Sequence, residues 1–158
     1  MDIIDNWSQI KRHFSLSFAS SLHVSIASVS EDGIPTVTPI GSLFLDDRAS
    51  GFYFEKFTKN LNLNSKNNKQ ICVLGVNSNR ILWIKALIKG QFQQSPALKL
   101  YGTLGIKRPA TQKELARLER RMRKTKYLKG HKLLWQNMNQ IRELKFHKAE
   151  KMKLGAMS

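Results

Sequence analysis

Alternating apolar positions constrain this chain most strongly. In the region 98–106, every second position holds an apolar residue or glycine, in the order Leu98, Leu100, Gly102, Leu104 and Ile106. A period of two is typical of a β-strand that buries one face. Since other short runs in the chain are rich in β-branched and aromatic residues, we expect an antiparallel β-structure.

Turn signals separate the further strands. Gly33, in the sequence SEDG, supplies a residue that tolerates positive φ between two extended runs, and the cluster DDRASG forms a second turn. The sequence predicts five more strand segments, the last of which reads as one strand or two, at residues 23–29, 36–45, 51–57, 71–77 and 143–154. An Asn- and Lys-rich stretch at 58–70 is predicted to be a loop with room for a short helix.

Helices are predicted at both ends of the chain. Helical spacing follows Asp2 and gives a short amphipathic N-terminal helix built on Ile3, Ile4, Trp7, Ile10 and Phe14. A second helix ending at Gly90 is favoured for residues 81–90, and a third is predicted around 133–141.

The clearest helix start lies in the last third. Thr111 and Glu114 have the spacing of a capping box, and Pro109 stands just before them. Leu115, Leu118 and Met122 then form one apolar stripe, so arginines such as Arg117, Arg120, Arg121 and Arg123 take the remaining faces. No repeat and no linker divides the chain. We therefore expect one domain, 1–158, that is mainly β with flanking helices, an α+β fold.

Positive charge is concentrated in the second part of the chain. The whole chain has 27 Lys and Arg against 11 Asp and Glu, a net charge of +16; residues 1–57 carry 4 basic and 7 acidic side chains, and residues 58–158 carry 23 and 4. The densest stretch, 107–132, holds eleven basic and two acidic residues. Such a stretch is most often a solvated face, and a polyanion such as nucleic acid is the alternative partner.

Several classes of function lose their support. There is no nucleophile elbow, no phosphate-binding P-loop and no dinucleotide fingerprint. Cys72 is the single cysteine, and the histidines lack ligand spacing, so we expect no metal site. With no apolar run of about 20 residues and an acidic start, we expect a cytoplasmic protein with no membrane partner.

The remaining chemistry lies where the strand GFYFEKF enters the Asn-rich stretch. Lys56, Thr58, Lys59, Asn60 and Asn62 offer ammonium groups, a hydroxyl and amides within a few residues. Several donors together with positive charge are what a phosphate group requires.

The segment 20–77 resembles the core of the pyridoxamine 5'-phosphate oxidase-like family of FMN-binding split barrels. The matching pieces occur in the family's order: a small-residue strand, the hairpin DGIP, the strand PIG, the strand GFYF, the segment KNLNL and a hydrophobic strand. The resemblance implies a six-stranded antiparallel split barrel with an N-terminal helix and two helices in the C-terminal third. It also implies a homodimer that binds FMN at the subunit interface.

The resemblance implies one ring-binding segment and one phosphate-binding segment. In the first, the backbone of four residues would run beside the isoalloxazine ring: Ile40, Gly41, Ser42 and Leu43. In the second, the residues near the ring, the ribityl chain and the phosphate would be Glu55, Lys56, Thr58, Lys59 and Asn62. In the ordinary structural reading, Pro39 and Gly41 mark a strand edge, and Lys56 and Lys59 are solvated.

Two departures from the family pattern separate the chain from vitamin B6 oxidation. Ile40 falls where the family's ring-facing strand arginine would sit, and Thr58 precedes Lys59 where an Arg-Lys pair is expected. We therefore expect a small FMN-dependent oxidoreductase of unknown substrate, with no catalytic residue identified. The alternatives are a polyanion-binding module that uses 107–132, and a haem-binding split barrel that uses His131 or His147.

Overall fold

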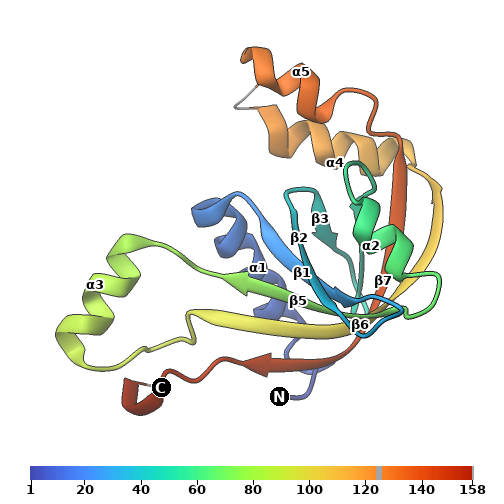
Figure 1. Cartoon of the computed structure of the whole chain (residues 1–158). Coiled ribbons are helices and arrows are strands. Elements are labelled where there is room, and N and C mark those ends of the chain that lie inside the picture. Colours follow the sequence, from blue (N-terminus) through green and yellow to red (C-terminus); the bar gives the residue numbers. More distant parts are fainter. Residues whose placement is uncertain (124–125, 158) are drawn as a thin grey trace.

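The computed structural model describes residues 1–123 and 126–157; Lys124 of the basic stretch lies outside the described residues. The strands are β1 (Val24–Val29), β2 (Pro35–Ile40), β3 (Leu43–Leu45), β4 (Ser50–Phe54), β5 (Gln70–Val76), β6 (Ala97–Pro109) and β7 (Gln140–Lys151). The helices are α1 (Trp7–Ser21), α2 (Lys59–Asn64), α3 (Arg80–Lys89), α4 (Gln112–Met122) and α5 (Lys129–Trp135), with a 3₁₀ turn at Gly155–Met157. Figure 1 shows the curled sheet with α4 and α5 together at one end and α3 projecting at another.

A two-residue link curls the open sheet into a half-barrel. The described strands form one antiparallel sheet in the order β2-β1-β5-β6-β7-β4-β3, so β2 and β3 are its two edges. Yet only Gly41 and Ser42 stand between the end of β2 and the start of β3. Three residues span at most about 11 Å, so the two edges must come together at this corner. The corner is the predicted ring-binding segment.

Two hydrophobic clusters fill the barrel and its flank. The larger lies between the inner face of the sheet and α1, and includes Ile10, Phe14, Ile26 and Leu100. The smaller lies beneath α4, where Leu118 and Met122 pack against Phe44, Phe52 and Phe54.

The predicted number of strands was wrong by one. Within the described residues the sheet has seven strands, not six, because the predicted strand 36–45 divides at Gly41 into β2 and β3. The division has a physical cause, since the chain turns the barrel corner there and the two halves pair with different neighbours, β1 and β4. The other predicted strands are confirmed, and the closing segment is a single strand, β7.

The predicted helices at both ends are confirmed, with shifted bounds. The N-terminal helix begins at Trp7, because the Asp2 carboxylate accepts from the backbone N–H of Ile4 and Asp5 and holds a separate turn. The C-terminal helix α5 ends at Trp135, well before the predicted 141. The short helices at 59–64 and 80–89 are also present as α2 and α3.

Arg108 ties the start of α4 to the paired strands β6 and β7. The capping box is formed, with Thr111 accepting from the backbone N–H of Glu114 and the Glu114 carboxylate accepting from that of Thr111. Arg108 of β6 donates to both Glu114 oxygens at 2.8 and 3.0 Å and to Glu143 of β7 at 2.7 Å. The pKa of Glu114 is lowered, mainly by the hydrogen bonds that its carboxylate accepts from the Arg108 guanidinium.

No helix among the described residues is both long enough and apolar enough to cross a membrane.

Candidate functional site

The barrel corner brings the two predicted binding segments together. β3 pairs with β4, which places Leu43 opposite Tyr53. The buried Ser42 hydroxyl accepts from the Phe54 backbone N–H at 3.2 Å and donates to the Phe54 carbonyl at 3.3 Å. The corner 40–43 therefore lies directly beside the strand end from which Glu55 and Lys56 continue.

Lys56 is held by the carboxyl end of α5. Its Nζ donates to the carbonyl of Gln136 at 2.6 Å and more weakly to those of Leu133 and Leu134 at 3.3 and 3.4 Å. These partners are neutral dipoles at a helix C-terminus, where a cation is favoured. The positive charge of Lys56 is therefore not cancelled by them, and it can still attract an anion.

The start of α2 offers further donors beside Lys56. Thr58 is buried at the N-cap position, but its side chain makes no capping hydrogen bond to the helix. Lys59 is exposed one residue later. Between them and Lys56 lies Phe57, a residue that is 72% exposed and whose φ of 62° is unusual for an aromatic side chain.

Glu55 and Asn62 share a partner that the sequence analysis missed. Arg142 of β7 binds both Glu55 carboxylate oxygens at 3.1 Å and donates to Asn62 Oδ1 at 2.7 Å. The side chains of Glu55 and Arg142 are only 4% and 13% exposed, so this is a buried ion pair. A signal was present, because Arg142 lies in phase with the core residues Leu144 and Phe146 on one strand.

Tyr53 adds an uncommitted polar atom to this region. Its buried hydroxyl makes no hydrogen bond among the described residues. Burial, followed by the nearby Glu55 carboxylate, raises the pKa of Tyr53, so the phenol stays protonated.

Two arginines of α4 point inward, contrary to the sequence-based expectation that they lie on a solvated face. The Arg121 guanidinium lies 3.6 Å from the Phe44 ring centroid and donates to the carbonyls of Leu43 and Gly41. Arg117 donates to the Leu45 carbonyl at 3.0 Å and pairs with the Asp46 carboxylate. These bonds hold α4 along the free edge of β3.

Burial changes the acidity of Arg121. Desolvation first, and then the charge of the neighbouring Arg117, lower the pKa of Arg121 to about 10. The group is still a cation at neutral pH. A permanent positive charge therefore sits against the corner carbonyls, the place where the resemblance puts the ring of a cofactor.

Gly41 lets α5 approach the corner closely. A Cβ atom at this position would lie 3.0 Å from the Trp135 ring and 3.4 Å from the Leu22 carbonyl. Trp135, which the sequence did not assign to the site, therefore covers the corner together with Arg121. The surface near the corner thus combines aromatic carbon with positive charge.

The two histidines named for the haem alternative lie on different elements. His147 is exposed on β7, and His131 lies on α5. In the described part of the chain, no three His, Cys, Asp or Glu side chains gather where they could hold a metal ion.

Comparison with known proteins identifies the fold. No protein-family model and no curated protein matches the sequence. Solved structures do match: an FMN-binding protein from Syntrophomonas wolfei has a TM-score of 0.62 at 12% identity and covers 95% of this chain and 94% of its own. A candidate pyridoxamine 5'-phosphate oxidase from Lactobacillus delbrueckii has a TM-score of 0.54 at 16% identity, with 89% and 91% covered. The chain has the fold of the pyridoxamine 5'-phosphate oxidase-like split barrels.

A protein described as a haem protein also matches this fold. The structure of HutZ, described as a haem storage protein from Vibrio cholerae, has a TM-score of 0.52 at 9% identity and matches over the full length of both chains. At such identities the likeness establishes the fold, and the ligand has to be argued from the residues at the corner.

Proposed function

We propose that this split barrel binds FMN at its corner and acts as a small flavin-dependent oxidoreductase. One observation carries the proposal: the glycine-containing corner 40–43, the aromatic ring of Trp135 and the cations Lys56 and Arg121 all meet at one place. Fold neighbours that are described as FMN-binding support the same ligand.

The donor set fits the phosphate end of FMN. Lys59 supplies an exposed ammonium group, Thr58 supplies a hydroxyl that is free of the usual capping bond, and Lys56 adds positive charge nearby on the side of the ring and ribityl chain. A phosphate prefers such charged and neutral donors together. Asn62 is oriented by Arg142, which is itself held by Glu55, so in this proposal Glu55 positions a polar group for the ribityl chain.

The residues at the corner fit the ring end. Gly41 adds no side chain to the corner, and the neighbouring Trp135 ring would offer aromatic carbon to a flat group. Bound FMN would supply hydride transfer, which no side chain of the corner can provide. Arg121 would favour negative charge on a neighbouring ring, in place of the family's strand arginine at the position of Ile40.

The proposal includes a homodimer with the flavin at the interface. The outer face of β1, β2 and β5 supports it, because apolar side chains there are exposed or half-buried while α1 and α2 pack on the inner face. The substrate would enter from the solvent side of this interface, and its class stays open.

The polyanion alternative is weakened by the structure. Arg108, Arg117 and Arg121 are committed to internal partners, so they are not presented to a phosphate backbone. Haem is the stronger alternative, because a haem storage protein shares the fold and His131 lies on α5 one turn before Trp135.

Titration of the purified protein with FMN, followed by quenching of flavin fluorescence, tests the proposal. We expect saturable binding of FMN. Riboflavin, which lacks the phosphate, should bind at least tenfold more weakly. Lys59→Met should reduce the difference between the two ligands, while Lys66→Met, a matched exposed lysine near the end of α2, should not. Absence of saturation by FMN, with uptake of haem instead, would contradict the proposal.

A further inference from the structure

The outward side of α3 carries an apolar stripe that no described residue covers. Ile81, Ile84, Leu87 and Ile88 are between 56% and 80% exposed, and at 100° per residue they share one side of the helix. The helix is not merely frayed, since Asn79 caps its start and Gly90 ends it with φ of 68°. An exposed apolar stripe on a well-capped helix marks an interaction surface.

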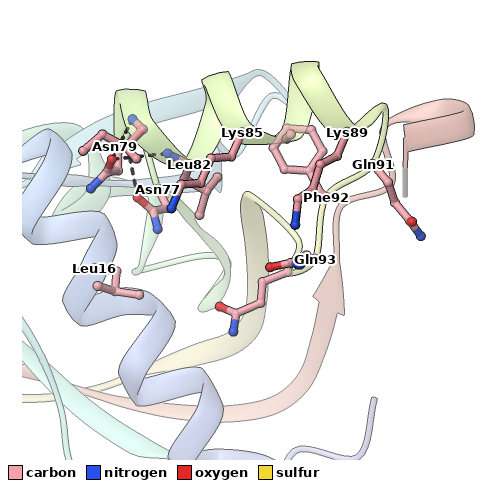
Figure 2. Close-up of a pocket in the computed structure, with 12 residues that line it drawn as sticks. Leu16, Asn77, Asn79, Leu82, Lys85, Lys89, Gln91, Phe92 and Gln93 are labelled. Atoms are coloured by element: carbon pink, nitrogen blue, oxygen red, sulfur yellow. Dashed lines mark hydrogen bonds between the residues drawn. The ribbon is translucent and has the colours of Figure 1, made fainter.

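The opposite side of α3 faces the body of the protein. Trp83 packs on Phe92 with ring centroids 5.1 Å apart, and its indole N–H donates to the Asn77 carbonyl at 2.9 Å. Lys85, Lys89 and Leu16 line a hollow of about 370 Å³. Figure 2 shows Leu16 on α1, across from the two lysines of α3. Ile81, at the start of the stripe, also lines this hollow, whereas Ile84, Leu87 and Ile88 do not and face solvent.

A sheet face of matching character begins beside α3. Residues that pair directly across strands lie on one side of a sheet, and the rows Val37–Ala27–Cys72 and Pro39–Ser25–Leu74 share the outer face. These side chains are half-buried or exposed, whereas the alternate positions of β1 and β5 are core. The prolines of the edge strand β2 disfavour addition of a further strand, so a partner would pack onto the face.

The far end of the same face carries the complementary charge. β1 and β5 are antiparallel, so the β1–β2 turn lies at the end of the sheet opposite to α3. The turn holds Glu31 and Asp32 beside the exposed Ile34 and Val37. In contrast, residues 56–113 contain no Asp or Glu at all, and α3 carries Arg80, Lys85 and Lys89.

We propose that a second copy of this chain docks on the outer face of β2, β1 and β5 in antiparallel orientation. In this two-fold arrangement, α3 of each copy covers the acidic β1–β2 turn of the other. The inference rests on the homodimer proposed above and names its surface. A two-fold axis that lies in the contact plane, perpendicular to the strands, brings opposite ends of one face together, so an apolar basic end and an apolar acidic end on the same chain are self-complementary. Each contact is therefore made twice.

A charge-swap cycle, read by sedimentation velocity across a concentration series, tests the arrangement. One variant, Arg80→Glu with Lys85→Glu, reverses the charges that flank the stripe; another, Glu31→Arg with Asp32→Arg, reverses the turn. We expect each to weaken the dimer at least tenfold, and the combination of all four changes in one chain to restore the dimerisation constant to within about threefold of wild type. The matched control, Arg120→Glu with Arg123→Glu on the exposed side of α4, should leave dimerisation unchanged.

Removal of the apolar contact gives a second test. Ile84→Asp with Ile88→Asp should yield a monomer with an unchanged circular dichroism spectrum. A stripe variant as dimeric as wild type, or a combined swap no tighter than either single swap, would overturn the proposed surface while leaving the homodimer standing. A monomeric wild type that floats with phosphatidylglycerol vesicles would also overturn it, and would assign the stripe to lipid. Flavin content is measured on every sample, so loss of this surface is distinguishable from failure of flavin binding.

Discussion

α3 and α4 are both basic helices inserted between strands of one barrel, and they pack in opposite ways. α4 has few apolar residues, yet it buries Leu118 and Met122 and turns two arginines inward onto backbone carbonyls. α3 is far more apolar, yet four of its large side chains are exposed. Figure 1 shows the two helices at different ends of the molecule.

The difference follows from what each helix meets. The edge of β3 and the barrel corner present free carbonyls and aromatic rings, which a guanidinium satisfies by hydrogen bonds and stacking. Isoleucine has no polar atom and gains only from exclusion of water. Charged groups can therefore be buried where partners exist, and apolar groups stay exposed until a partner arrives.

The largest effect is expected where a buried charge loses its partner, at the ion pair of Glu55 and Arg142. Arg142→Met leaves the Glu55 carboxylate buried without its partner, which typically costs about 3–5 kcal/mol of folding free energy. Urea unfolding at neutral pH measures it. The double variant Arg142→Met with Glu55→Gln should recover part of the loss, because no buried charge is left. A single variant as stable as wild type would show that the pair is not buried.

A smaller effect is expected at α4. Arg121→Met preserves much of the volume but removes a charged donor from the carbonyls of Gly41 and Leu43, which typically costs about 1.5–3 kcal/mol. Arg120→Met, on the exposed side of the same helix, should change stability by less than about 0.5 kcal/mol. Equal effects in the two variants would contradict the inward orientation of Arg121.

The stability that Glu114 contributes at the start of α4 should depend on pH. Glu114→Gln weakens both the capping box and the contact with Arg108. It should therefore lower the free energy of unfolding by about 1–2 kcal/mol at neutral pH. Since Arg108 lowers the pKa of Glu114 in the folded state, the stabilisation is complete above the ordinary value of 4.5 and is lost as the pH falls toward the lowered value. Unfolding curves between pH 3 and 7 should therefore converge for the variant and the wild type at the acid end. A constant difference across that range would contradict the assignment.

The smallest expected effect lies on α3. Ile88→Gln changes a side chain that is 80% exposed, so under dilute conditions in which the chain is monomeric its free energy of unfolding should shift by less than about 0.5 kcal/mol. Its solubility should rise. A loss of more than 1 kcal/mol in the monomer would show that the stripe is covered within one chain.

The strands and most helices could be predicted because their signals are local. Alternation at 98–106 gave β6, and the capping box gave the start of α4. The division of the predicted strand 36–45 at Gly41 was missed because it depends on a corner that exists only in the curled sheet. The inward turn of Arg117 and Arg121 was missed for the same reason, since their carbonyl partners are more than 70 residues away in sequence.

The sequence indicated the two chain segments of the candidate site, but not the residues from other elements that lie against them. Lys56 and the corner 40–43 were identified from motif order, and the structure brings them together. Arg142 and Trp135 belong to other elements, and no local pattern ties them to that corner. Sequence spacing reports neighbours along the chain, whereas a site on a curled sheet is assembled from distant strands.

The visible absorption spectrum of the protein as purified, before and after saturation with FMN, tests the central claim most directly. We predict the two bands of an oxidised flavin, bleached by dithionite and restored by air, with a sub-stoichiometric preparation filled by added FMN to one flavin per chain. A colourless protein that takes up no FMN, or a spectrum with the Soret band of haem, would contradict the account.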